Sequence, residues 1–172
     1  IFLHDDLTTQ LGTFALLPQV VRAVDLPVIA AGGIADAAGV AAARALGASA
    51  VQVGTAYLLC PEARTSALHR AALQSAQAQH TALTNVFTGR AARGIVNRAM
   101  RVLGAEGHSG DCISSQAPAF PLAATHLAPL RAWAESQGRD DFTPLWAGQA
   151  APLARAMPAA ELTQALAEGW RG

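Results

Sequence analysis

The sequence predicts an α/β fold, the C-terminal portion of a (β/α)8 TIM barrel with an added mainly helical lobe. Two short apolar runs, residues 28–31 and 50–53, each lead into glycine, and an alanine-rich segment of helical character lies between them. A strand, a helix and a second strand in that order form a β-α-β unit with parallel strands. Both runs are apolar on both faces, so we expect both strands to be buried.

The residues that follow each predicted strand suit a phosphate group. Gly32 and Gly33 follow the first strand, and Gly54 and Thr55 follow the second. Glycine lets a ligand approach the backbone closely, and the free N–H groups there can donate hydrogen bonds. We expect helices after both turns, so that two positive helix ends converge on one dianion. A single turn would serve the backbone alone, but two after neighbouring strands match the phosphate site after strands seven and eight of a (β/α)8 barrel.

Helix signals flank this unit. Apolar residues at helical spacing predict a helix over residues 13–24 that packs against the sheet. Asp36 is placed to cap the helix that runs to residue 46, and Gly47 is placed to end it. Further on, Ser66 is placed to cap another helix, on which we expect His69 to be a surface residue.

The rest of the chain divides into further elements. Residues 81–87 alternate as a strand outside the barrel, helical spacing returns over residues 118–137, and Pro158 begins a final helix. We therefore predict a partial barrel with the phosphate site over residues 1–80, a mainly helical lobe over 81–144 and a C-terminal helix returning to the barrel over 145–172. A complete barrel needs about 250 residues, so these 172 residues are expected to be the C-terminal part of a longer protein or a truncated homologue.

Several strings of residues resemble one family. V-I-A-A-G-G-I-A-D, A-L-G-A-S-A-V-Q-V-G-T-A-Y-L and the C-P-E-A that follows are similar to nitronate monooxygenases, formerly called 2-nitropropane dioxygenases, as are F-T-G-R-A-A-R-G-I-V-N and L-W-A-G-Q-A-A downstream. The resemblance covers most of the chain. It implies an FMN enzyme that oxidises alkyl nitronates with O2 to a carbonyl compound and nitrite.

The resemblance also implies site residues. The FMN contacts carried over are Gly32, Gly33, Gln52, Val53, Gly54 and Thr55, with Val53 contributing its backbone only. Gln52 is the polar side chain of the second strand, and we expect it to be buried with a hydrogen-bond partner. No catalytic residue is assigned, because the family's histidine lies in an A-G-G-H-R-G segment expected upstream of residue 1. His4 lacks the flanking glycines and does not take that role.

Composition excludes several classes of function. The formal net charge is zero and no basic run occurs, so nucleic acid and acidic membranes are not expected partners. No apolar run is long enough to span a membrane, and the two cysteines have neither disulfide nor metal spacing. We therefore expect a cytoplasmic protein that holds no metal, and a homo-oligomer stays open. The resemblance implies a small nitronate and O2 as its reactants.

Three alternatives stay open at this point. An FMN-dependent enoyl-acyl-carrier-protein reductase has similar Gly-Gly and Gly-Thr turns and uses NAD(P)H. A flavin-free barrel acting on a sugar phosphate also fits, because a phosphate site does not name its ligand. The third alternative is an inactive fragment without a complete active site.

Overall fold

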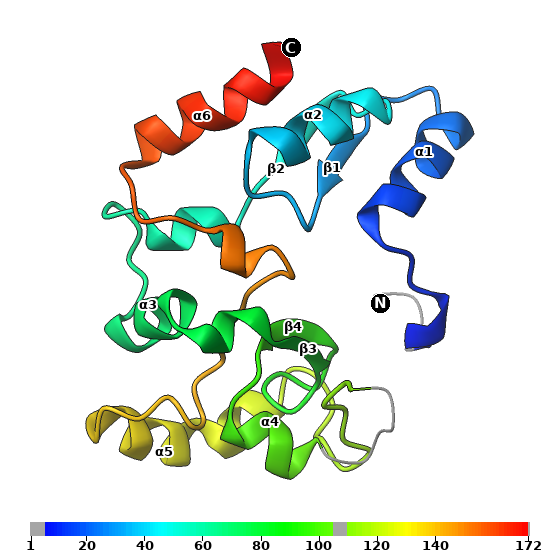
Figure 1. Ribbon diagram of the computed structural model, residues 1–172. Helices are drawn as coiled ribbons and strands as arrows, with labels where there is room; N and C mark the ends of the chain where they lie inside the picture. Colours follow the sequence, from blue (N-terminus) through cyan, green and yellow to red (C-terminus); the bar gives the residue numbers. More distant parts are fainter. Residues whose placement is uncertain (1–5, 105–109, 172) are drawn as a thin grey trace. The chain divides into compact units, whose positions relative to one another are not determined.

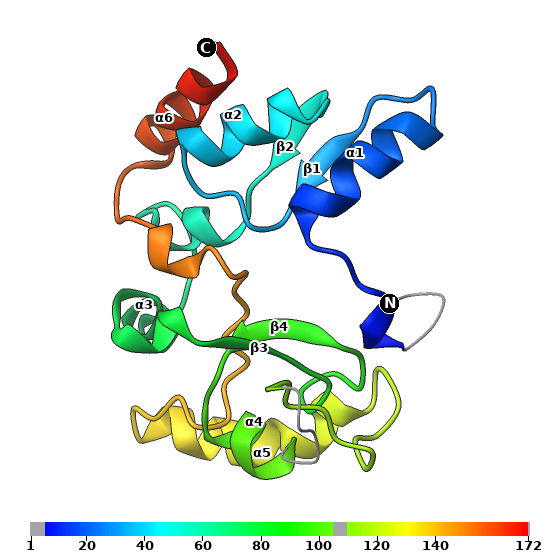
Figure 2. The same ribbon diagram turned by 45° about the vertical axis from the view of Figure 1, so that its right-hand side comes forward.

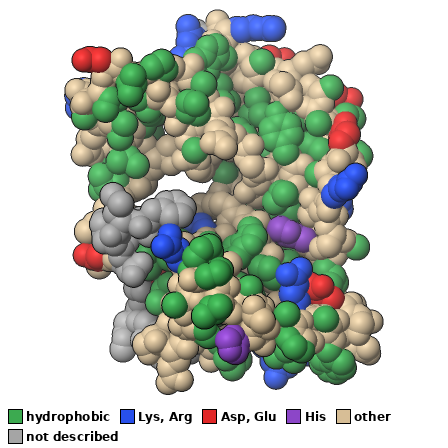
Figure 3. Space-filling view, turned by 180° about the vertical axis from the view of Figure 1, so that it is seen from behind, with side chains coloured by type: hydrophobic (Ala, Val, Ile, Leu, Met, Phe, Trp, Pro, Cys, Tyr) green, Lys and Arg blue, Asp and Glu red, His purple; other side chains and the backbone are tan. Residues whose placement is uncertain are grey.

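The computed structural model describes residues 6–104 and 110–171. The chain forms two compact units. Residues 7–65 and 148–172 form one, which we call the glycine-turn unit, and residues 66–147 together with Asp6 form the other, which we call the hairpin unit. No helix among the described residues is long and apolar enough to cross a membrane. On the face seen in Figure 3, basic side chains are dispersed among acidic and apolar ones.

The glycine-turn unit is built around two parallel strands (Figure 1). Ile29 pairs with Ala50 and Ala31 with Gln52, so the strands are in register over their whole length. The order β1, α2, β2 confirms the predicted β-α-β unit. The elements of this unit are η1 (Leu7–Thr9), α1 (Thr13–Ala23), β1 (Ile29–Ala31), α2 (Ala37–Ala45), β2 (Ala50–Gln52), η2 (Thr55–Leu59), η4 (Ala151–Leu153) and α6 (Ala159–Arg171).

All three α-helices of this unit pack on one face of the sheet (Figure 2). On that face Ala30 is buried with Leu17 of α1 and Ala43 of α2, and Val51 also packs against Leu162 and Leu166 of α6. Side chains alternate along a strand, so the neighbouring residues point to the other face.

The other face of the sheet is exposed, so within this chain the prediction of two fully buried strands is wrong. Ile29 is 60% exposed, and Ala31 and Gln52 are exposed as well. An apolar run shows only that a strand can be buried on both faces. Which face the helices cover is decided by tertiary packing, and here α1, α2 and α6 all lie on the same side.

Local capping signals in this unit are confirmed. The Oδ1 atom of Asp36 accepts a hydrogen bond from the N–H of Gly39 at 2.8 Å, which caps α2. Gly47 ends the helix with a φ of +96°, a conformation that other residues avoid. The start of α6 is capped from a distance, because the carboxylate of Glu62 accepts the N–H of Ala159 at 3.1 Å from each oxygen. This gives the C-P-E-A string a structural role.

The hairpin unit contains the antiparallel pair β3 (Thr81–Thr84) and β4 (Ala92–Ile95). Residues 145–147 extend this sheet, since Ile95 N–H donates to Leu145 O at 2.8 Å and Ala147 N–H donates to Arg93 O at 3.2 Å. The ring of Trp146 meets that of Phe87 edge to face at 5.6 Å between centroids. The other elements are α3 (Ala67–Gln74), η3 (Ala76–Gln79), α4 (Arg98–Leu103) and α5 (Ala123–Ser136).

The compact units and the predicted regions divide the chain differently. The predicted boundaries are residues 80 and 144, whereas the units change after Thr65 and after Ala147. Residues 66–80 belong with the hairpin because η3 runs directly into β3, where His80 O accepts the N–H of Val96 at 3.0 Å. The assignment of residues to barrel and lobe stays a prediction.

His69 is partly buried in the hairpin unit, so its prediction as a surface residue is wrong. Ser66 caps α3 as expected, accepting the N–H of His69 at 3.3 Å. The His69 side chain, however, has an Nε2 atom that is buried and has no hydrogen-bond partner among the described residues. Burial lowers the pKa of His69, and a hydrogen bond to the backbone of Trp146 partly offsets that shift.

We expect this buried histidine to make the protein less stable in mild acid. Its pKa in the folded state lies below the ordinary value, so below a pH of about 6.5 the unfolded chain takes up a proton that the folded chain resists. Above that pH, the free energy of unfolding therefore includes the full contribution of the neutral His69. This contribution is lost as the pH falls through the folded-state pKa. Urea unfolding between pH 8 and pH 5 should show a steeper loss for the wild type than for His69→Gln. Equal slopes would contradict the prediction.

Candidate functional site

The turns after β1 and β2 lie at the same edge of the sheet. The strands are parallel and Ala31 is opposite Gln52, so Gly32 and Gly33 leave β1 at the level where Val53 and Gly54 leave β2. The structure therefore brings together the two glycine turns that the sequence predicted as one site. The carboxyl ends of parallel strands are the usual place for ligands in α/β proteins.

The first turn requires glycine at two consecutive positions. Gly32 has a φ of +96° and Gly33 a φ of +75°, in the left-handed region that side chains with a Cβ atom disfavour. The Thr13 hydroxyl at the start of α1 donates a hydrogen bond to Gly32 O at 2.9 Å. This bond fixes the turn from the preceding helix.

Both turns border open space. A Cβ atom added at Gly33 would have no neighbour within 4 Å, and the same is true at Gly54. Gly54 has a φ of −113°, so its backbone does not itself require glycine. The absence of a side chain there leaves room for an external group to reach the backbone amides.

The second turn is tied to a segment far along the chain. The Oγ1 atom of Thr55 accepts the N–H of Gly148 at 2.9 Å, across 93 positions in sequence. Gly148 belongs to the L-W-A-G-Q-A-A string, which therefore lies beside the predicted site. Sequence reasoning had no signal for this contact, since neither residue type nor spacing indicates the pairing.

Helices follow both turns, as predicted, but neither of them offers the free N-terminus of an α-helix. The helix after the second turn is the 3-10 helix η2, five residues long, and α2 is already capped by the carboxylate of Asp36. Short helices have small dipoles, and a capping carboxylate disfavours a second anion. The donors at this edge are thus the turn amides and the Thr55 hydroxyl.

The two remaining predicted contacts point to opposite faces of the sheet. Gln52 is exposed, so the expectation of a buried amide is wrong. It lies on the face that no helix covers. The Val53 side chain packs in the apolar cluster under α6, so any contact of Val53 with a ligand at the turns stays a prediction for its backbone.

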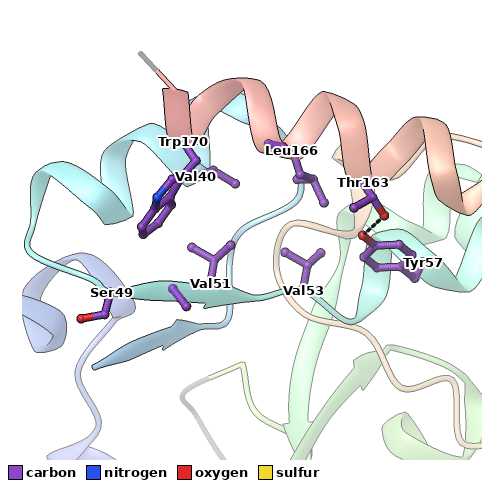
Figure 4. Close-up of a pocket in the computed structure, with 10 residues that line it drawn as sticks. Val40, Ser49, Val51, Val53, Tyr57, Thr163, Leu166 and Trp170 are labelled. Atoms are coloured by element: carbon purple, nitrogen blue, oxygen red, sulfur yellow. Dashed lines mark hydrogen bonds between the residues drawn. The ribbon is translucent and has the colours of Figure 1, made fainter. Parts of the chain in front are cut away.

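An apolar cavity lies on the helix-covered face of β2 (Figure 4). Its volume is about 460 Å³, and the hydroxyls of Tyr57 and Thr163 are hydrogen bonded at 2.8 Å on its wall. Val53 is the only predicted site residue in its lining, and it contributes its side chain. The cavity is therefore separate from the glycine turns. Other lining residues are Val40, Val51, Leu166 and Trp170.

The edge formed by the two turns offers neutral hydrogen-bond donors around open space. Such a site suits a phosphate, whose oxygens only accept hydrogen bonds when it is a dianion. It holds no nucleophile or base of its own, and the described residues contain no group of His, Cys, Asp or Glu that could hold a metal ion. His4, which the sequence analysis did not assign a role, lies outside the described residues.

The sequence was compared with models of protein families, and one model matches nearly the whole chain. The model of the nitronate monooxygenase family matches residues 4–169. The chain belongs to the nitronate monooxygenase family. This confirms the resemblance found in the sequence, and the matched range includes both glycine turns and the L-W-A-G-Q-A-A string.

Individual members of the nitronate monooxygenase family are similar over nearly the whole chain. A nitronate monooxygenase of Pseudomonas aeruginosa is 44% identical over 162 residues, covering 94% of this chain and 44% of the relative. One of Paraburkholderia phytofirmans is 43% identical over 166 residues, covering 96% of this chain and 44% of the relative. The chain thus spans less than half the length of the curated relatives it matches.

Solved structures agree with this family assignment. The nitroalkane oxidase of Streptomyces ansochromogenes superposes with a TM-score of 0.79 at 39% identity, covering 94% of this chain and 44% of that one. FabK from Thermotoga maritima gives a TM-score of 0.71 at 29% identity, covering 94% and 50%. The chain therefore has the fold of about half of each of these proteins.

Proposed function

We propose that this chain is part of an FMN-dependent enzyme that oxidises alkyl nitronates with O2 to a carbonyl compound and nitrite. The observation that carries the proposal is the pair of glycine turns held in register at one edge of β1 and β2, both bordering open space. Membership of the nitronate monooxygenase family supports the choice of reaction. The likeness to a nitroalkane oxidase structure supports it further.

We further propose that the sheet is part of a (β/α)8 barrel. In a doubly wound fold the helices cover both faces of a parallel sheet, whereas in a barrel they all lie outside. Here α1, α2 and α6 lie on one face only, and the opposite face carries the exposed Ile29, Ala31 and Gln52. In the proposal that opposite face is the barrel interior.

The residues at the turns fit the phosphate end of FMN. The amides of Gly32, Gly33 and Gly54 and the hydroxyl of Thr55 would hold the phosphate, and Gln52 stands on the uncovered face beside them. The bound flavin would supply the redox chemistry. No proton acceptor is assigned among the residues of the glycine-turn unit, whose described part contains no histidine.

The likeness to FabK supports a second candidate, an FMN-dependent enoyl-acyl-carrier-protein reductase. Its sequence identity is 29%, against 39% for the nitroalkane oxidase, and its TM-score is lower. The two candidates differ in their substrates and products. Nitrite release from an alkyl nitronate supports the first, and NADH oxidation that depends on an enoyl thioester supports the second.

The experiment that tests the proposal starts from the purified protein supplied with FMN. We expect flavin absorption bands that persist after gel filtration, release of FMN on heating, and O2 uptake with nitrite formation when a nitronate is added. The same gel filtration with light scattering measures whether the protein is a homo-oligomer. Absence of any bound flavin would overturn the FMN assignment and favour a flavin-free barrel or an inactive chain.

A further inference from the structure

The hydrogen bond between Thr55 and Gly148 has a consequence for how the proposed cofactor is recognised. A threonine hydroxyl has one hydrogen to donate and two lone pairs to accept with. The Gly148 N–H occupies one lone pair of Thr55 Oγ1 at 2.9 Å. The hydroxyl hydrogen cannot point at that N–H, so it must be directed elsewhere.

That hydrogen has no acceptor in the part of the chain that the structure describes. Among the described residues, Thr55 Oγ1 makes one hydrogen bond, which it accepts from Gly148. The hydroxyl follows directly on Gly54, where an added Cβ atom would meet nothing within 4 Å. Thr55 is partly exposed and adjoins Gly54 in the chain, so the open space beside Gly54 is where the inference directs this donor.

Both backbone groups of Gly148 are hydrogen bonded. Its N–H donates to Thr55, and its carbonyl accepts the N–H of Ala151 at 3.0 Å at the start of η4. The amide is therefore a fixed donor that orients the hydroxyl.

We propose that Gly148 is a positioning residue that orients the Thr55 hydroxyl as a hydrogen-bond donor to the phosphate of the flavin, and so favours FMN over riboflavin. The inference rests on the proposed function. It gives the L-W-A-G-Q-A-A string a part in the site through the backbone amide of Gly148. The Thr55 hydroxyl contacts the phosphate, and Gly148 acts only through Thr55.

The test compares FMN with riboflavin, which lacks the phosphate. Apoprotein is titrated with each flavin, and the dissociation constant is read from flavin fluorescence. Thr55→Val keeps the side-chain shape without the hydroxyl, and it should weaken FMN binding by about tenfold to a hundredfold, the range for a hydrogen bond to a charged group. Riboflavin binding should change by no more than about twofold. Thr55→Ser keeps the hydroxyl and should retain the preference for FMN.

The role of Gly148 is tested by a double-mutant cycle. Gly148→Pro removes the N–H and should weaken FMN binding by about tenfold, with no further loss when it is added to Thr55→Val. Gly148→Ala keeps the N–H, and its Cβ would lie 3.6 Å from Thr55 Oγ1, an ordinary contact, so it should bind FMN like the wild type. Thr163→Val removes a hydroxyl of the same unit that bonds Tyr57 and should leave both flavins unaffected.

Three outcomes would overturn the inference. Equal losses for FMN and riboflavin in Thr55→Val would show that the hydroxyl does not meet the phosphate. Additive losses in the double variant would show that Gly148 does not act through Thr55. A wild-type protein that binds neither flavin would overturn the proposed function as well. If Gly148→Pro has a changed circular dichroism spectrum, hydrogen exchange of the Gly148 amide decides instead. Exchange should be slow in the wild type and faster in Thr55→Val, and equal rates would overturn the role of Gly148.

Discussion

Replacing Gly54 with valine is expected to abolish detectable FMN binding while the protein stays folded. The φ of −113° at Gly54 suits any residue, and an added Cβ atom would meet nothing within 4 Å, so the new side chain fits the protein. It would, however, fill the space beside the turn amides that the phosphate needs. We expect the dissociation constant for FMN to rise at least about a hundredfold, or about 2.7 kcal/mol. Fluorescence titration of the apoprotein measures it.

A matched control adds the same side chain elsewhere in the glycine-turn unit. Ala160 is exposed on α6, and Ala160→Val should leave FMN binding unchanged at a cost in stability of about 0.5 kcal/mol. Thermal unfolding of both variants should confirm that each is folded. Normal FMN affinity in Gly54→Val would mean that the phosphate does not lie beside this turn, and the proposed site would have to be abandoned.

Replacing Gly169 with alanine is expected to destabilise the protein although alanine is the better helix former. In an isolated helix this change stabilises by about 1 kcal/mol. Here α6 packs against α2 so closely that a Cβ atom at Gly169 would overlap the carbonyl oxygen of Ala37. Overpacking against backbone forces the helices apart, and we expect a net loss of about 1–3 kcal/mol. Urea unfolding measures the free energy.

The control for this prediction is the adjacent position. Glu168 is exposed on the same helix, so Glu168→Ala should change the free energy of unfolding by no more than about 0.5 kcal/mol. If Gly169→Ala proved as stable as the wild type or more so, the close packing of α6 on α2 would be refuted. The proposed flavin site would be unaffected, because Gly169 is not one of its residues.

Features that depend on neighbouring residues were predictable from the sequence. Asp36 caps the helix that begins at the next residue by accepting the N–H of Gly39, and Gly47 adopts the left-handed conformation that ends it. The β-α-β unit follows from two apolar runs separated by a helical segment. The register of β1 and β2 then places the two glycine turns side by side.

Burial was predicted less well because it depends on what packs against each element. The apolar runs could not show that α1, α2 and α6 would lie on one face and leave Ile29 and Gln52 exposed. The partial burial of His69 was also not predicted. It arises from packing within the hairpin unit, where His69 lies against the backbone of Trp146. A residue's type gives its tendency to be buried, and its neighbours decide the outcome.

The sequence by itself determined the β-α-β unit, the two glycine turns and the family of this protein, because each rests on residues close together in the chain. Only the tertiary structure decided that Glu62 caps α6, that Gly148 holds Thr55 and that Gly169 lets α6 approach α2. The first two contacts join residues 97 and 93 positions apart. Local sequence patterns do not predict such contacts, because the contacts form only when packing brings distant segments together.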